Sequence, residues 1–441
     1  MALGGGTWVT QNKVLPGTYH NFVSARRAFV NLSNRGYAAA PMKLTWGKDD
    51  GVFTVTADEL LTDSLNIFGY DYTSPQLKGI RDLFKNANTV FFKKLNLGGV
   101  AAANAYADAK YVGTRGNDLM TVITANADDP SLFNVKTLLG GLEVDNQIGV
   151  ATAAELVENE FVKFKPAASL VVTVGTPFTG GTDGNGEDTG APHQAALDEL
   201  EAYGFNVLAC LTDVALLKTL YIEYTKRMRD ETGAKFQVVV FNADAPDHEG
   251  VINVENAAIG TDEEAFGAVY WTAGAEAGVA INQTTTNKVY NGEHTLSMAT
   301  TNTQAKLIEL IKEGKFAFHG VDDSVRVLDD INSFTSFTPE KNEDFAMNQL
   351  IRIIDQIAID TANIFNNRYL GKVPNDADGR ISLWNDIGSH RLELQRLRAI
   401  QNYDINQLIV SPGTQKNAVE AYEVIEWTAT MTKLYVTTVV A

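Results

Sequence analysis

The chain has 441 residues, of which 45% are hydrophobic and 20% are charged, and its formal net charge at pH 7 is −18. This length exceeds one ordinary hydrophobic core and predicts about two to four domains in a folded protein. The acidic balance argues against a nucleic-acid coat, because binding phosphates requires a positive face.

Three sequence features bear on the cellular compartment. No apolar run is long enough to cross a bilayer, and the opening residues MALGGGTWVTQ lack the basic and apolar regions of a secretory signal peptide. The single cysteine, Cys210, excludes a disulfide framework within one chain and a multi-cysteine metal site. We therefore expect a protein that inserts into no membrane and works without an oxidising compartment.

The first 23 residues are unlike the start of a compact domain. A flexible glycine lead is followed by a short strand and then by a turn at Pro16-Gly17. The lead is Gly4, Gly5 and Gly6, and the strand is Thr7, Trp8, Val9 and Thr10. Because Trp8 is a poor residue to leave in water, residues 1–23 are a candidate arm that pairs outside their own domain. A disordered terminus is the alternative.

Residues 24–96 and 193–337 alternate between helical and extended patterns, which predicts one central α/β domain. Helix Val214–Glu231, for example, precedes strand Phe236–Phe241. Such alternation favours a largely parallel sheet with helices on its faces. The intervening residues, 97–192, contain short strands separated by turns and predict an inserted, mostly β domain.

Residues 338–427 predict a C-terminal α+β domain. Helix Asp344–Tyr369 has apolar residues at helical spacing, and a second helix, Ser382–Ile400, precedes strands Asn406–Val410 and Ala418–Trp427. We therefore predict an α/β and α+β multidomain protein: a central α/β sheet, an inserted mostly-β domain, a C-terminal α+β domain and extended strand arms at both ends.

The last segment, residues 428–441, is apolar and rich in β-branched residues, and Lys433 is its only charged side chain. One strand face would carry Leu434, Val436 and Val440, and the other Tyr435 and Val439. A strand that is apolar on both faces requires cover on both sides. Two interpretations are open: the last strand of the domain's own sheet, or an arm that adds to the sheet of another copy.

The sequence gives no positive case for catalysis. The loop Gly180–Asp188 offers Asp183, Asn185 and Glu187 at alternate positions, but it lacks the Lys-Ser/Thr of a phosphate loop and the final Glu of a calcium loop. His248 has no second histidine at metal-ligand spacing. We therefore expect no cofactor, no metal ion and no enzymatic activity.

Helix Ser382–Ile400 carries a basic face that stands out in an acidic chain. Arg391 and Arg398 are seven residues apart with Gln395 between them, beside an apolar stripe. This face is a candidate contact with an acidic partner, and a solvated face is the alternative.

A collinear set of segments resembles the tail sheath proteins of contractile phage tails and of phage-tail-like bacteriocins. The strongest similarity lies in Ile331–Thr335, Gln349–Asp355, Tyr369–Asn375 and Thr432–Thr437. Further similarity lies in Pro16–Tyr19, Ala109–Asn117, Ala273–Gly278 and Val289–Gly292. No single segment is catalytic or specific, so the shared order carries the resemblance.

The resemblance implies a helical homopolymer of sheath subunits around an inner tail tube, with baseplate and terminator proteins at its ends. It implies that the N- and C-terminal arms add strands to the C-terminal sheets of neighbours. The C-terminal domain would face the tube, which makes Arg391, Gln395 and Arg398 candidate tube contacts, and the inserted domain would point outward. Assembly is expected in the bacterial cytoplasm, without nucleic acid and without membrane insertion.

We therefore hypothesise a contractile tail sheath subunit, whose metastable extended assembly contracts to drive the tube through a target cell envelope. The alternative is an α/β enzyme or nucleotide-binding protein with a site at the strand ends of Phe205–Phe318. A surface-layer or adhesin subunit is disfavoured by the missing signal peptide.

Overall fold

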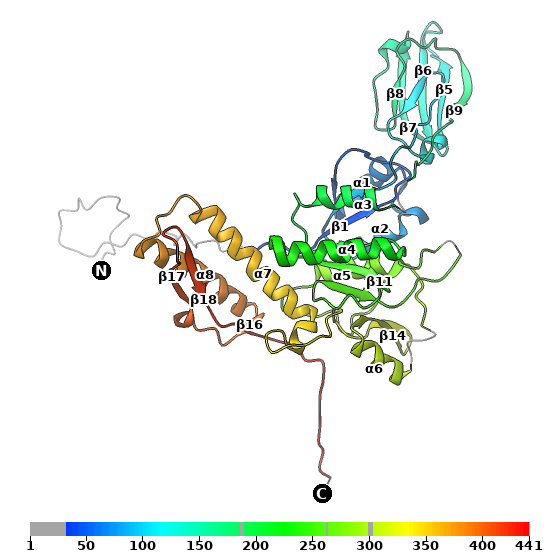
Figure 1. Ribbon diagram of the computed structural model, residues 1–441. Helices are drawn as coiled ribbons and strands as arrows, with labels where there is room; N and C mark the ends of the chain where they lie inside the picture. Colours follow the sequence, from blue (N-terminus) through cyan, green and yellow to red (C-terminus); the bar gives the residue numbers. More distant parts are fainter. Residues whose placement is uncertain (1–31, 186–188, 262, 299–302, 441) are drawn as a thin grey trace, which may run out of the picture. The chain divides into compact units, whose positions relative to one another are not determined.

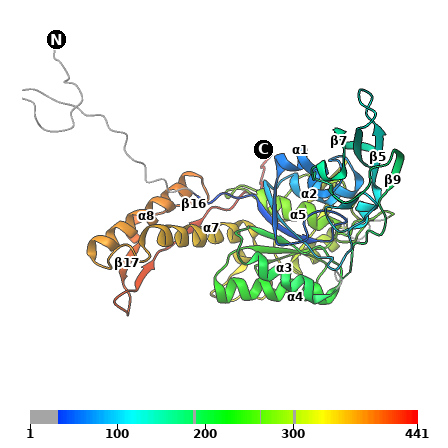
Figure 2. The same ribbon diagram turned by 90° about the horizontal axis from the view of Figure 1, so that it is seen from above.

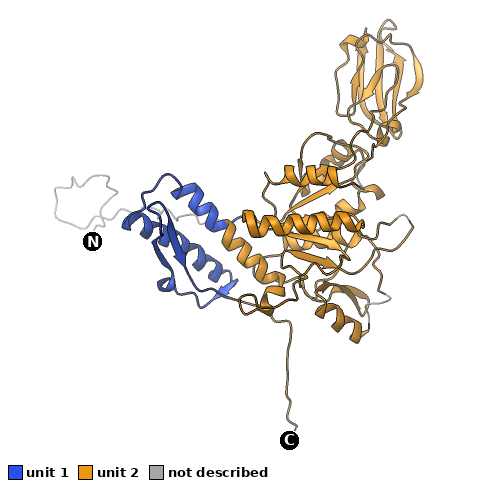
Figure 3. Ribbon diagram, viewed as in Figure 1, with its two compact units in different colours: residues 1–33, 360–426 blue, residues 34–359, 427–441 orange. Residues whose placement is uncertain are grey.

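The computed structural model describes residues 32–185, 189–261, 263–298 and 303–440. The chain divides into two units, which Figure 3 distinguishes by colour. Unit 1 comprises residues 1–33 and 360–426, and unit 2 comprises residues 34–359 and 427–441. The proposed N-terminal arm, with Gly4–Gly6 and Thr7–Thr10, lies outside the described residues.

Unit 2 is built around a seven-stranded sheet with the order β13-β12-β11-β10-β1-β3-β2. Two of its strands, β1 and β11, are labelled in Figure 1. Neighbouring strands are parallel except at one edge, where β2 runs antiparallel to β3. Most residues of these strands are apolar and many are buried, which is typical of a parallel sheet covered on both faces. They are β1 (Tyr37–Met42), β2 (Phe53–Thr56), β3 (Thr89–Lys94), β10 (Val207–Ala209), β11 (Gln237–Phe241), β12 (Val251–Val254) and β13 (Lys315–Phe316).

Helices cover both faces of this sheet, and each face has its own hydrophobic core (Figure 2). Because successive residues of a strand point to opposite faces, Ala38 and Ala40 belong to the core beneath α5, and Ala39 to the core beneath α3 and α4. The helices of the unit are α1 (Ala57–Phe68), α2 (Lys78–Phe84), α3 (Gly190–Leu200), α4 (Ala215–Arg227), α5 (Gly267–Gly278) and α6 (Gln304–Lys312).

The buried helix α5 packs directly on the backbone at the end of α2. A Cβ atom on Gly274 would lie 2.1 Å from the backbone oxygen of Leu83, and one on Gly278 would lie 1.9 Å from that of Asn86. Only glycine permits so close an approach between backbones.

The inserted part of unit 2 is a small β domain. Its four-stranded antiparallel sheet has the order β7-β6-β5-β9, and β4 and β8 form a separate antiparallel pair. Leu119, Leu139, Phe161 and Phe178 pack together with Trp46 in its core. The strands are β4 (Ala107–Ala109), β5 (Leu119–Ala125), β6 (Phe133–Leu139), β7 (Leu142–Val150), β8 (Val162–Phe164) and β9 (Thr173–Pro177).

Unit 2 also contains a short β-hairpin and the first part of a long helix. A hairpin of β14 (Phe318–Val321) and β15 (Ser324–Val327) follows β13. Helix α7 (Asn348–Ile364) begins in unit 2 and ends in unit 1. Residues 338–359, which the sequence grouped with the C-terminal domain, therefore belong to unit 2.

Unit 1 contains helix α8 and a β-hairpin on a small apolar core. The core is Ile364, Tyr369, Leu383, Ile387 and Leu408. The predicted helix Ser382–Ile400 is displaced toward the N-terminus, because the carboxylate of Asp376 caps its start by accepting from the N–H of Gly379 at 2.8 Å. The elements are α8 (Ala377–Arg396), β16 (Ile400–Gln401), β17 (Ile409–Pro412) and β18 (Val419–Tyr422), and the two-residue strand β19 (Glu426–Trp427) includes the last residue of unit 1 and the first residue of the C-terminal part of unit 2.

The predicted fold class is confirmed by this architecture. The central sheet is parallel apart from β2, the inserted part is a β domain, and helices and hairpins are combined in unit 1.

Candidate functional site

The C-terminal segment, residues 428–440, has no strand partner among the described residues, and no element is formed beyond Trp427. Its large side chains are exposed: Leu434 by 87%, Tyr435 by 90%, Val436 by 71%, Val439 by 86% and Val440 by 90%. The interpretation as a last strand of the domain's own sheet is therefore wrong for the described chain. An exposed segment that is apolar on both faces has the character of an interaction element.

The start of this segment is held by a buried side chain of α7. Gln349 is only 4% exposed, and its amide Nε2 donates to the backbone oxygen of Thr428 at 3.0 Å. The amide Oε1 accepts from both the N–H and the hydroxyl of Thr430, each at 3.1 Å. One residue earlier, the indole Nε1 of Trp427 donates to the carboxylate of Asp344 at 3.4 Å. The segment thus leaves unit 2 from a fixed position.

The predicted basic face on α8 is not present as expected. Arg391 is 2% exposed, and its guanidinium donates to the carboxylate of Glu423 at 2.8 to 3.2 Å and to the hydroxyl of Thr361 at 2.9 Å. Arg391 is therefore a buried structural residue and not a surface contact. The spacing of seven residues placed it on the correct helix but could not show that Glu423 covers it.

The other two residues of the proposed face have different surroundings. Gln395 is partly buried, and its Oε1 accepts from the N–H of Tyr403 at 2.6 Å. Arg398 is exposed and lies beyond the end of α8, where its φ of 62° stops the helix. Of the three, only Arg398 is available at the surface of unit 1.

The hydrogen-bonded residues around His390 do not form a catalytic triad. The buried His390 ring has its Nε2 2.8 Å from Asp360, and Asp360 also accepts from the backbone N–H of Ser33 at 3.0 Å and from its hydroxyl. A nucleophilic serine must instead bond to the imidazole, which takes its proton. Arg391 donates to Nδ1 of His390 at 2.6 Å, so the second ring nitrogen is occupied as well.

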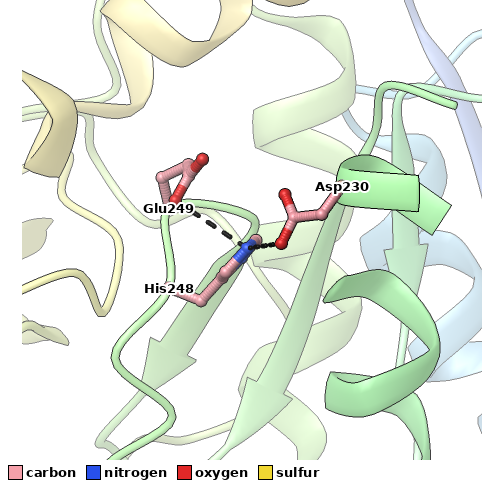
Figure 4. Close-up of side chains that lie close together, drawn as sticks. All are labelled: Asp230, His248 and Glu249. Atoms are coloured by element: carbon pink, nitrogen blue, oxygen red, sulfur yellow. Dashed lines mark hydrogen bonds and ion pairs between the residues drawn. The ribbon is translucent and has the colours of Figure 1, made fainter. Parts of the chain in front are cut away.

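Asp230, His248 and Glu249 bring three possible ligand atoms within 4.8 Å of one another (Figure 4). The backbone N–H of Gly250 donates to Nδ1 of His248 at 2.9 Å, so the ring proton lies on Nε2, which faces Asp230 at 3.3 Å. A metal ion would need the lone pair of that nitrogen. Glu249 is also paired with Lys341 at 2.6 Å. These contacts fit a hydrogen-bonded network rather than a metal centre.

The glycine-rich loop of the inserted domain also uses its carboxylate internally. Asp183 accepts from the N–H of Thr114 at 2.6 Å and from its hydroxyl at 2.9 Å. The turn that contains Thr114 therefore binds a carboxylate of this chain, and Asp183 is not a free calcium ligand. Glu187 lies outside the described residues.

A cavity of about 440 Å³ lies at the carboxyl ends of β1, β3 and β10, where the alternative enzyme hypothesis expects a site. Its charged lining consists of Lys43, Asp213, Glu263 and Glu264. Burial, with Asp213 close by, raises the pKa of Glu264. A cavity lined mainly by carboxylates is unsuited to a phosphate group.

None of the described helices combines the length and the apolar character needed to span a bilayer.

The sequence reasoning missed Gln349 and the buried polar residues beside it on α7. The sequence does contain a signal that could have found them, namely polar residues that recur at helical spacing among apolar ones. These residues are Asn348, Gln349, Arg352, Asp355 and Gln356, and all of them are buried in the structure. Polar side chains in such positions require partners from elsewhere in the fold.

The chain matches four family models, all of tail sheath proteins. Their descriptions and matched residues are the Phage tail sheath protein central domain (186–333), the Phage tail sheath C-terminal domain (340–441), the Phage tail sheath protein beta-sandwich domain (76–183) and the Tail sheath protein Gp18 domain III N-terminal region (35–91).

Individual relatives agree with these matches. The chain is 34% identical to a sheath tail protein of Desulfitobacterium hafniense, with a TM-score of 0.82 and coverage of 95% of this chain and 99% of that one. It is 30% identical to a sheath tail protein of Listeria innocua, with a TM-score of 0.77 and coverage of 91% and 93%. It is also 32% identical to the phage-like element PBSX protein XkdK of Bacillus subtilis over 92% of each chain. The chain therefore belongs to the phage tail sheath protein family and is a structural subunit of a tail sheath.

Proposed function

We propose that copies of this chain join into a helical sheath through strands that each copy donates to its neighbours. The observation that carries this proposal is the exposed, apolar C-terminal segment, residues 431–440, which leaves unit 2 from the fixed root at Thr428–Thr430. Addition to the edge of a neighbour's sheet would pair its backbone and bury both of its faces. Residues 1–23, in which the sequence predicts a short strand around Trp8, would form the corresponding N-terminal link.

The sheath would enclose an inner tail tube and end at baseplate and terminator proteins, after assembly in the bacterial cytoplasm. Arg398, exposed beyond the end of α8, would contribute a cation to the tube contact. Head-to-tail contacts that do not close on themselves generate such a helix.

Contraction would release free energy that was stored during assembly. The extended sheath would make limited contacts with the tube, and the contracted sheath would bury larger interfaces between subunits. A barrier between the two arrangements would make the extended form kinetically stable, so no nucleotide is required. Donated strands would keep neighbouring subunits joined while their rigid cores rotate and slide.

Deletion of residues 432–441 tests the strand exchange. The truncation keeps the root contacts of Thr428 and Thr430, so we expect a folded subunit with an unchanged thermal transition that forms no sheath tubes in electron micrographs. The matched control is Thr437→Ser, which keeps the length and character of the segment and should assemble normally. Long tubes from the truncated protein would refute the proposed strand exchange.

A further inference from the structure

The contact between Gln349 and the start of the C-terminal segment reproduces one residue of a parallel β-ladder. In such a ladder, a residue donates to the carbonyl of residue i of its neighbour and accepts from the N–H of residue i+2. The Gln349 amide does the same with Thr428 and Thr430, at 3.0 and 3.1 Å. A carboxamide can do this because it carries a donor and an acceptor side by side.

The helix that presents Gln349 is itself tied to the core of unit 2. The neighbouring Asn348 donates to Asp330 at 2.9 Å and accepts from Gln237 at 2.8 Å. One turn further along, Arg352 donates to Asp330 at 2.7 Å. These buried bonds on both sides fix the orientation of α7, so the Gln349 amide presents its two polar atoms at a defined position.

We propose that Gln349 is a positioning residue for the C-terminal segment. Its amide holds Thr428–Thr430 extended, so that residues 431–440 leave the subunit in the direction and register needed to pair with a second copy of this chain. This inference rests on the proposed strand exchange. Fixing the root before association removes part of the conformational freedom that pairing would otherwise have to restrain.

Two isosteric or near-isosteric changes separate the donor and acceptor functions from packing. Gln349→Glu keeps the shape but replaces the donor with an oxygen that repels the carbonyl of Thr428. Gln349→Met keeps approximate volume and removes all three hydrogen bonds to Thr428 and Thr430. On the other side of the contact, Thr430→Pro removes both the backbone N–H and the hydroxyl that donate to Gln349. Thr430→Val removes only the hydroxyl bond, so it is the control that isolates the loss of the backbone bond.

The first measurement is hydrogen–deuterium exchange of the unassembled full-length subunit. In the wild type we expect slow exchange in peptides covering residues 424–433, and faster exchange there in Gln349→Glu and Gln349→Met, with peptides of β10–β12 unchanged. This local effect distinguishes positioning from general stabilisation of the fold. Equal exchange of the 424–433 peptides in wild type and both variants would overturn the proposal.

The second measurement is the initial rate of tube formation followed by light scattering and electron microscopy. Loss of three neutral hydrogen bonds in Gln349→Met and of two in Thr430→Pro predicts initial rates that are lower by roughly tenfold or more. The double variant should be no slower than Gln349→Met alone, because that substitution already breaks every bond of the contact. Wild-type rates in Gln349→Met, or additive effects in the double variant, would reject the role of Gln349. Only tube formation by the 432–441 truncation would reject the strand exchange itself, so the two failures are distinguishable.

Discussion

Arg352 and Asp330 form an ion pair at 2.7 Å in which both side chains are only 2% exposed. The same guanidinium donates to the buried carboxylate of Glu276, whose other oxygen accepts from the hydroxyl of Thr285 at 2.7 Å. A second guanidinium, that of Arg35, donates to the backbone oxygen of Glu276 at 3.1 Å. This cluster attaches the first half of α7 to the central domain, and the position of Gln349 depends on it.

The ionisation of Glu276 should make the stability of the subunit depend on pH. Burial, with Asp330 beside it, raises the pKa of Glu276 from 4.5 to about 8. A carboxyl group whose pKa is raised by folding stabilises the folded state below its ordinary pKa, and this contribution is lost as the pH rises toward 8. We expect the unfolding free energy of the wild type to fall between pH 5 and pH 8.5 more steeply than that of Glu276→Gln, measured by urea titration. The exposed Glu340→Gln is the control, and parallel pH curves for wild type and Glu276→Gln would contradict the assignment.

Removal of the central cation should be strongly destabilising. Arg352→Met leaves Asp330 and Glu276 without their shared guanidinium, and breaking a buried pair from one side costs about 3–5 kcal/mol. The control is Arg368→Met, since Arg368 is 39% exposed in its pair with Asp386 and surface pairs contribute about 0–1 kcal/mol. Chemical denaturation of both variants measures the difference. Similar losses of stability in the two would show that the buried cluster does not anchor α7.

The sequence was sufficient for the fold class because the relevant signals are local. Apolar strands such as β11, alternating with helices of ordinary length, indicate a covered parallel sheet without reference to distant residues. The apolar, β-branched character of residues 428–440 was visible for the same reason. Whether residues 428–440 pair with a sheet of their own chain or remain unpaired depends on where every other strand lies. Local sequence patterns do not give that information.

The surroundings of individual polar side chains depend on long-range contacts and could not be derived in this way. Arg391 pairs with Glu423, 32 residues away, and Gln349 binds Thr428, 79 residues away. Helical periodicity placed Arg391 on a polar face of α8, but the segment that carries Glu423 returns over it. The sequence therefore showed which polar residues these helices carry, but it could not show which residues they contact.

The contact between α5 and the end of α2 should be intolerant of even one methyl group. Gly274→Ala places a Cβ atom 2.1 Å from the backbone oxygen of Leu83, so a helix must shift. Overpacking of this kind costs about 1–3 kcal/mol. Gly204→Ala is the control, because a Cβ atom there has no described atom within 4 Å and φ is not in the left-handed region. Thermal unfolding should show a lower midpoint for Gly274→Ala alone, and equal midpoints would mean that the helices can separate without loss.

The two arginines once assigned to a single face should respond differently to substitution. Arg391→Met removes the buried partner of Glu423, which is itself 19% exposed, and should destabilise unit 1 by about 3 kcal/mol. Arg398→Glu changes an exposed residue and should leave stability within about 0.5 kcal/mol of the wild type.

If Arg398 faces an acidic tube surface, its charge reversal should still weaken sheath assembly around purified tubes, because like charges would then meet at the interface. Tube-free polymers of the same variant provide the internal control and should form normally. Equal loss of both kinds of assembly would assign Arg398 to subunit–subunit contacts instead, and normal assembly of both would remove it from the interface.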